Sequence, residues 1–149
     1  MVLLGAAAVA VLTSSCSGLG QPSPTLTALK STPGSTLTYP GAQELFRTEQ
    51  DSSYRIGSNQ TASITVYGCS LDAAEKVTQF FQQSFTSAGW TVDVNAFIPT
   101  PGQFERGLGW RKGSVTATLG FATDGEANTL AQMVNHDPAC PTVYRTVSQ

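Results

Sequence analysis

The chain has 149 residues, with eight Lys and Arg against ten Asp and Glu and a formal net charge of −2. This length suits one domain with a hydrophobic core. The few cations are scattered along the chain. Because binding to nucleic acid requires clustered Lys and Arg, the composition excludes a nucleic-acid partner.

The N-terminus is typical of a bacterial secretory signal. Residues 2–12 form an apolar run, and three small polar residues then precede Cys16. The run is too short to cross a bilayer, which takes about 20 apolar residues, but it suits a signal-peptide core. We expect residues 1–15 to be a signal peptide and Cys16 to carry acyl chains such as palmitate. These chains would anchor the exported protein to the outer face of the cell membrane, or to the outer membrane of a Gram-negative cell. A misassigned start at Met1 and a cleaved signal without lipid remain alternatives.

The cysteine count supports this interpretation. The chain has three cysteines, Cys16, Cys69 and Cys140. If Cys16 carries lipid, the other two remain as a pair in a compartment where disulfides form. We therefore expect a Cys69–Cys140 bridge that closes a loop of about 70 residues. Two unpaired thiols are the alternative, whereas the spacing of His136 and Cys140 matches no zinc pattern.

The segment after Cys16 is rich in Ser, Gly and Pro. Such a segment buries too little apolar surface to offset its ordering entropy, so residues 16–36 are expected to form the lipidated cysteine and a flexible tether. A single domain then covers residues 37–149. It begins with a turn at Tyr39-Pro40-Gly41-Ala42 and a strand over residues 43–49.

The next two elements follow from periodicity. Residues 61–69 are rich in β-branched side chains and predict a strand, with Ile64 and Val66 on one side. Residues 70–89 predict a helix with Ser70 as N-cap, Asp72 in the first turn and Gly89 at the C′ position. Apolar residues at spacings of three and four define its buried face, namely Ala74, Val77, Phe81, Phe85 and Ala88, with Phe80 beside them.

Alternating residues predict the remaining strands. Trp90, Val92 and Val94 are expected in a half-buried strand, and a turn at Lys112-Gly113 joins two further strands. Asp124-Gly125-Glu126 is interpreted as a solvated turn, and residues 142–147 complete the sheet. These patterns predict an α+β, two-layer fold. A twisted, mainly antiparallel sheet packs against one long amphipathic helix, and its other face is solvated.

These motifs carry a resemblance. The Tyr39-Pro40-Gly41-Ala42 start, the Ala88-Gly89-Trp90 helix exit and the Trp110-Arg111-Lys112-Gly113 hairpin resemble those of small uncharacterised bacterial lipoproteins. Members of that group carry Phe-Tyr in the helix, where this chain has Phe80-Phe81. The resemblance implies a location in the cell envelope and carries over no active-site residue.

Candidate catalytic groups are few. His136 beside Asp137 is a candidate general base, but no Gly-x-Ser-x-Gly motif accompanies it. Two carboxylate pairs are candidates for acid–base chemistry, Asp93 with Glu105 and Asp124 with Glu126. The aromatic residues of the helix, with Trp90 and Trp110, form either the core or a ligand pocket, and we expect core.

We therefore expect a membrane-anchored, non-enzymatic interaction module without cofactor or metal. It contacts an envelope protein or glycan through a Thr-rich open sheet face or an exposed sheet edge. The alternative is a small apolar-ligand carrier or a weak hydrolase with a pocket between helix and sheet. A cavity beneath the helix with a polar group in it would favour the alternative, and a filled core would favour the module.

Overall fold

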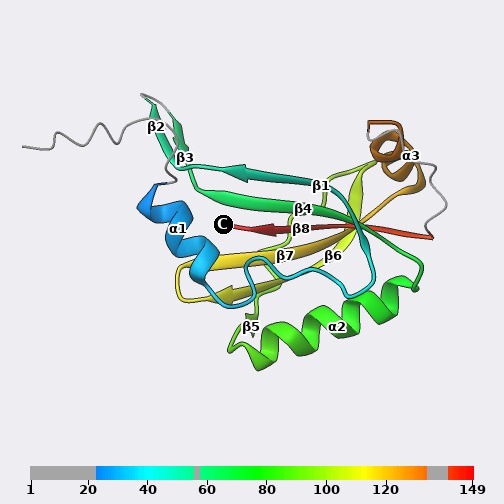
Figure 1. Cartoon of the computed structure of the whole chain (residues 1–149), viewed down its shortest axis with the longest axis horizontal. Helices are drawn as coiled ribbons and strands as arrows, with labels where there is room; N and C mark the ends of the chain where they lie inside the picture. The colour runs from blue at the N-terminus through cyan, green and yellow to red at the C-terminus, as the bar shows by residue number, and fades with distance from the viewer. Residues whose placement is uncertain (1–22, 56–57, 134–140) are drawn as a thin grey trace, which may run out of the picture.

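The computed structural model describes residues 23–55, 58–133 and 141–149. They form an α+β fold with a six-stranded antiparallel sheet, a separate two-stranded hairpin and three helices (Figure 1). The strand order in the large sheet is β1-β4-β8-β7-β6-β5. The elements in chain order are α1 (Pro24–Ser31), β1 (Gln43–Gln50), β2 (Ser53–Arg55), β3 (Ser58–Gln60), β4 (Ser63–Ser70), α2 (Ala74–Ser87), β5 (Thr91–Val92), β6 (Phe104–Lys112), β7 (Val115–Ala122), α3 (Asp124–Met133) and β8 (Thr142–Ser148).

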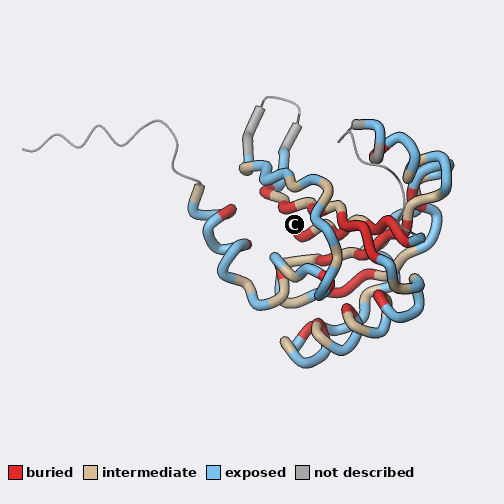
Figure 2. Tube along the Cα trace, turned by 45° about the vertical axis from the view of Figure 1, so that its right-hand side comes forward, coloured by how far each residue is buried: buried red, intermediate tan, exposed pale blue. Residues whose placement is uncertain are grey.

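The large sheet has two different faces because burial alternates along its strands. In β4, Ile64 and Val66 are buried while their neighbours are half-buried, as the sequence predicts. The pairing register places the buried residues of the other strands on the same side. We call this side the helix face; it carries Ile64, Val66, Trp110, Ala117, Leu119, Phe121 and Tyr144. The opposite side is called the second face. Figure 2 shows the buried residues concentrated in the central strands.

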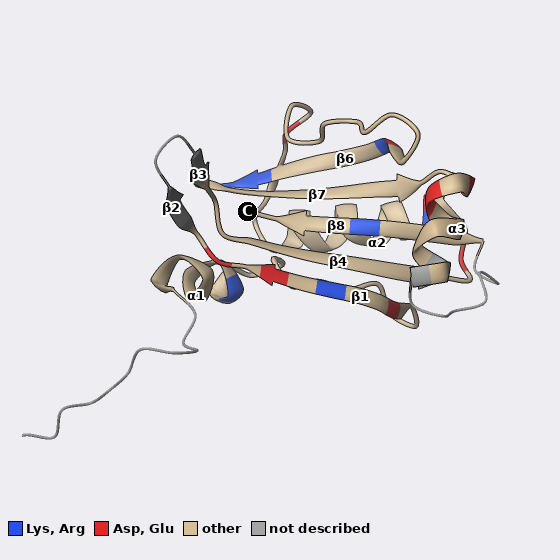
Figure 3. Cartoon of the chain, turned by 90° about the horizontal axis from the view of Figure 1, so that it is seen from above, with Lys and Arg blue, Asp and Glu red and all other residues tan. Residues whose placement is uncertain are grey.

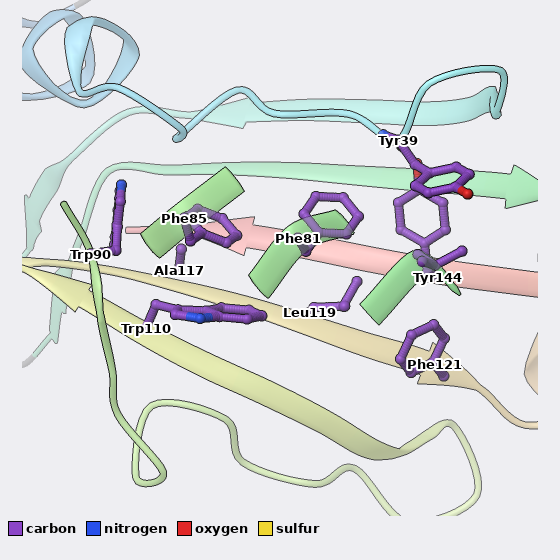
Figure 4. Packing of buried hydrophobic residues seen from close by; sticks show 10 residues of the cluster. Tyr39, Phe81, Phe85, Trp90, Trp110, Ala117, Leu119, Phe121 and Tyr144 are labelled. Atoms are coloured by element: carbon purple, nitrogen blue, oxygen red, sulfur yellow. Dashed lines mark hydrogen bonds between the residues drawn. The ribbon is translucent and has the colours of Figure 1, made fainter. Parts of the chain in front are cut away.

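Helix α2 covers the part of the helix face formed by β6, β7 and β8. Val77, Phe81 and Phe85 of α2 are at most 1% exposed and belong to the core cluster with the sheet residues. Figure 4 shows Phe81 and Phe85 between α2 and the sheet. Phe85 stacks on Trp110 with 4.6 Å between ring centroids. Burial of each such side chain contributes about 1.5–3 kcal/mol. The predicted apolar face of this helix is confirmed.

The C-terminus of α2 ends as predicted. Gly89 has a φ of +80°, a conformation that glycine adopts without strain. The N–H of Trp90 donates to the carbonyl of Phe85 at 2.9 Å, and that of Gly89 to Thr86 at 3.0 Å. These two bonds define a Schellman motif, and the contact between the Phe85 and Trp90 rings is its usual hydrophobic partner.

The N-terminus of α2 differs from the prediction. Ser70 remains in β4 and pairs with Thr142, and its Oγ accepts a hydrogen bond from the N–H of Asp72. The helix begins only at Ala74, and its N-cap is Ala73, which makes no side-chain capping bond. Because the pairing of β4 with β8 extends through Ser70, α2 starts later than predicted and has only 14 residues. The helix that packs on this part of the sheet is therefore shorter than the expected long helix.

Helix α1 lies where the sequence predicted a flexible tether. Its Leu26 and Leu29 are buried against Ala62, Ile64 and Val66, at the end of the helix face that α2 does not reach. The Ser23 Oγ caps the helix by accepting the N–H of Leu26 at 3.2 Å. The tether prediction is wrong for residues 24–31, because two leucines three positions apart bury together once the sheet provides a surface.

One end of the second face is also covered. Helix α3 places Leu130 against Phe104 and Val143, and the ring of Phe97 lies over Gly107 and Gly120. The prediction of a solvated turn at residues 124–126 is wrong, since these residues form the first turn of α3. The prediction of a fully solvated second face is likewise only partly correct.

Of the remaining predictions, two turns are confirmed and one strand is not. The predicted turn at Tyr39–Ala42 is confirmed by a 3.1 Å bond from the N–H of Ala42 to the carbonyl of Tyr39. The hairpin at Gly113 is confirmed by pairing of Lys112 with Val115. The strand predicted from Trp90 to Val94 is largely wrong. Only two of its residues pair with β6, and Val92 and Val94 are exposed because the chain turns away after Asp93.

Candidate functional site

Several predicted site residues cannot be placed. Cys16, His136 and Cys140 lie outside the described residues. Cys69 closes the buried end of β4 and pairs in register with Val143 of β8. In the sequence, Cys140 precedes Val143 by three positions. The bridge between them stays a prediction.

The carboxylates of the two candidate pairs have contacts or positions of their own. Asp93 Oδ2 accepts a 2.8 Å hydrogen bond from Arg111 Nε, and this cation lowers the pKa of Asp93. Glu105 accepts the N–H of Gly102. Asp124 and Glu126 lie in the first turn of α3, where the helix dipole favours anions. Each carboxylate therefore has a structural role.

The aromatic cluster under α2 is a filled core. Phe81, Phe85, Trp90 and Trp110 are at most 3% exposed, and their rings are in mutual contact. None of these four residues lines the groove between α2 and β6 that is described below. Trp110 Nε1 is buried and lacks a hydrogen-bond partner among the described residues. By the criterion set from the sequence, a filled core favours an interaction module.

A titratable cluster lies beside the start of α2. Tyr39 donates its hydroxyl proton to Asp72 Oδ2 at 2.7 Å, and Lys76 Nζ donates to Asp72 Oδ1 at 2.8 Å. The hydrogen bond from Lys76 lowers the pKa of Asp72, and the same carboxylate raises the pKa of Tyr39 and of Lys76. All three shifts move away from neutral pH, whereas a general acid or base needs a pKa near it. Around neutral pH, Asp72 therefore stays ionised, Lys76 stays protonated and Tyr39 stays neutral.

An open groove of about 390 Å³ runs between the N-terminal half of α2 and β6. Leu108 and Phe121 provide apolar surface, and Ala74 and Thr78 of α2 are small enough to leave the space open. Arg106, also in the lining, is exposed and forms no ion pair with a described residue. Glu75 is the other charged residue of the lining. A concave site with apolar surface and a few polar groups has the general form of a small-molecule site.

Both edges of the large sheet are protected. β1 carries Glu44, Arg47 and Glu49, and its pairing with β4 is interrupted by an irregularity after Glu44. Charged side chains and bulges on an edge strand oppose pairing with another chain. At the other edge, β5 and the segment that follows it run along the outer side of β6 (Figure 3). The sheet edges are therefore poor candidates for an interaction surface.

The second face has an uncovered area, which we call the open region. In Figure 3, α2 lies behind the sheet and α3 covers only one end of the front, so the middle of β4, β8 and β7 faces the viewer without a helix over it. Apart from one arginine, the side chains here are threonine, valine or aromatic and are half-buried or exposed. The open region consists of Phe46, Thr48, Thr65, Tyr67, Thr116, Thr118, Arg145 and Val147.

One cross-strand row gives the open region its charge and its rings. Phe46 of β1 pairs with Tyr67 of β4, and Tyr67 pairs with Arg145 of β8. The Phe46 and Tyr67 rings are 5.9 Å apart, and Phe46 is 44% exposed. The guanidinium carbon of Arg145 lies 4.1 Å from the centroid of the buried Phe104 ring. A cation at this distance over a ring face is held by the ring quadrupole.

No pattern in the sequence marks Phe46, Tyr67 and Arg145 as a group. Successive members are separated by 21 and 78 positions in the chain. The available signal was parity, because Tyr67 and Arg145 both occupy strand positions between buried residues that lie on the opposite face. Parity shows on which face a side chain lies, but not which strand lies beside it.

Comparison of the chain with known protein families, with curated proteins and with solved structures gives no match. Among the described residues, no cluster of three or more His, Cys, Asp or Glu is arranged to hold a metal ion. In the same part of the chain, no helix has the length and apolar character needed to span a membrane. The site is therefore interpreted from its own geometry.

Proposed function

We propose that this chain is a bacterial lipoprotein whose domain acts as a non-enzymatic interaction module in the cell envelope. The open region carries the proposal. It is a surface without a covering helix, poor in charge and containing aromatic rings and an arginine. Protein interfaces and ligand surfaces are enriched in aromatic residues and arginine and depleted in other charged residues. The aromatic core beneath α2 is closed, which supports a surface rather than an internal site.

The anchor is proposed to be a lipid on Cys16. Only six residues separate Cys16 from Ser23, where the described fold begins. Seven peptide steps span at most about 25 Å, so the lipid would hold the domain close to the headgroups. A single acyl chain gives only marginal binding, so stable attachment requires more than one chain on the cysteine. We expect Cys16→Ser to release the protein from membranes, which fractionation of the cells measures. The intact mass of the mature wild-type protein shows whether Cys16 carries lipid. A mature mass without lipid would contradict the anchor.

A photo-crosslinking experiment tests the module. A benzoylphenylalanine at Thr65 in the open region of the full chain should give a discrete adduct in intact cells. The same residue at Thr86, which is exposed on the solvent side of α2, is the matched control. Equal adducts from both positions, or none from Thr65, would contradict an interaction through the open region.

A second candidate function is a carrier of small apolar ligands, which the groove between α2 and β6 favours. In this case an apolar fluorescent dye should bind saturably to the purified domain. Ala74→Trp should fill the groove and abolish that binding while the crosslinks from Thr65 persist. Dye binding that is insensitive to Ala74→Trp would remove the carrier from consideration.

A further inference from the structure

The open region contains a cation, Arg145, that contacts an aromatic ring and has no anionic partner among the described residues. Arg145 makes no hydrogen bond or ion pair with another described residue, in contrast to Arg47 and Arg111, which each bind a carboxylate. Contact with the Phe104 ring fixes the plane of the guanidinium but uses none of its five N–H donors. The donors of Arg145 are therefore available to a ligand.

The chemistry of a guanidinium defines the group that it would bind. Its planar fork matches the two oxygens of a carboxylate in a bidentate arrangement, which is among the strongest hydrogen-bonded pairs in proteins. The residues that define the open region include no acidic side chain. Charge complementarity thus favours a ligand that carries a carboxylate.

The surroundings of Arg145 define the rest of the ligand. Tyr67 and Phe46 continue the same row and present ring surface beside the cation. The next row contains Thr48, Thr65, Val147 and Thr118, whose three hydroxyls are both donors and acceptors. A sugar ring has apolar C–H faces for the aromatic rings and hydroxyls for the threonines.

The shape of the surface separates a glycan from a protein partner. Protein partners usually insert anchor side chains into packed pockets at the centre of an interface. The groove between α2 and β6 contains none of the residues of the open region. The open region instead presents two rows of side chains that cross neighbouring strands, and such rows suit a chain of sugar rings that lies across the strands.

We propose that the open region binds an acidic glycan, with Arg145 pairing with a sugar carboxylate and Tyr67 and Phe46 contacting the sugar rings. This inference rests on the proposed interaction module and specifies the chemistry of its partner. Among the described cations, Arg145 alone combines placement in the open region with freedom from a carboxylate partner.

The test is an NMR titration of the purified domain with trigalacturonate at low salt, with the trimethyl ester of the same trisaccharide as the uncharged control. We expect the shifted resonances to lie in β1, β4 and β8, and the ester to bind at least about tenfold more weakly, because it lacks the carboxylates. Binding should also weaken as salt is added, since the contact is exposed.

Matched variants localise the effect. Arg145→Gln should weaken trigalacturonate binding about tenfold or more, and Arg145→Lys several-fold, because lysine retains the charge but loses the bidentate fork. Phe46→Ala should weaken it several-fold. Lys76→Gln removes one positive charge from an exposed lysine of α2, on the opposite side of the sheet, and should leave binding unchanged.

Three results would overturn the inference. These are binding that Arg145→Gln leaves intact, an ester that binds as well as the acid, or a polyglutamate peptide that binds as tightly as trigalacturonate, which would indicate an acidic protein instead. In each case the crosslink from Thr65 decides separately whether the interaction module itself stands.

Discussion

The two faces of the large sheet are built from the same strands, yet they differ in almost every physical property. Phe81 and Tyr144 at the helix face are at most 1% exposed, and that face is closed by α2 and α1. Phe46 on the second face is 44% exposed, and α3 closes only one end of that face. The comparison shows that strand alternation assigns a side chain to a face, whereas the covering helices decide whether that face becomes core or surface.

The difference in burial between the two faces also separates residues that stabilise the fold from residues that are available to a partner. Residues of the helix face pack in a filled core, where truncation leaves a cavity. Residues of the open region contact solvent on one side, so their removal costs little folding energy and leaves them available for a partner. Four stability experiments follow, from the largest expected effect to the smallest; the first three bear on this separation.

Phe81→Ala should lower the free energy of unfolding by about 3–5 kcal/mol, through lost burial and a residual cavity beneath α2. Phe46→Ala makes the same chemical change on the second face and should cost at most about 1 kcal/mol. Urea denaturation of both variants measures the two costs. If Phe81→Ala melts like the wild type, the cluster under α2 is a pocket and the carrier becomes the better function.

Cys69→Ser should lower stability by roughly 2–5 kcal/mol if the predicted bridge to Cys140 exists. Cys69 lies at the covered end of the second face, so the bridge would strengthen the one part of this face that behaves as core. Alkylation of unfolded, unreduced protein followed by mass spectrometry provides the check. Alkylated Cys69 and Cys140 would rule the bridge out.

Gly68→Ala should cost about 1–3 kcal/mol through overpacking. A Cβ at Gly68 would lie 2.3 Å from the ring of Tyr144, which is buried and accepts the N–H of Tyr39 and therefore has little freedom to move. Gly120→Ala is the counterpart on the second face, where the nearest atom belongs to the half-buried Phe97. Thermal melts should show the smaller loss for Gly120→Ala, and equal losses would mean that both faces are packed alike.

Asp72→Asn should have the smallest effect, and the effect should depend on pH. Lys76 and Tyr39 hold the pKa of Asp72 below 3.8 in the folded state. A lowered folded-state pKa contributes stability that is present above the unfolded pKa and is lost as pH falls through the folded pKa. The wild type should therefore melt slightly above Asp72→Asn at about pH 6, and the difference should shrink as the pH falls below the ordinary pKa of an aspartate. A difference that grows on acidification would contradict this assignment.

Much of the fold could be predicted because its signals are local. The spacing of Val77, Phe81 and Phe85 defined the buried face of α2, and Gly89 marked its end. Alternation placed Ile64 and Val66 together, and Gly113 marked the hairpin. The start of α2 was predicted too early, because pairing of Ser70 with Thr142 depends on a strand more than seventy residues away.

The sequence by itself determined the class of fold, the alternation of Ile64 and Val66 in β4, and the expectation of an exported, lipid-modified chain at Cys16. The tertiary structure decided the rest. In the folded chain, α1 packs against the core and β8 lies between β4 and β7. This strand order places Phe46, Tyr67 and Arg145 in one cross-strand row. The physical reason is that period and turn residues act within a few positions, whereas strand order and register are set by which apolar surfaces the assembled helices can bury together.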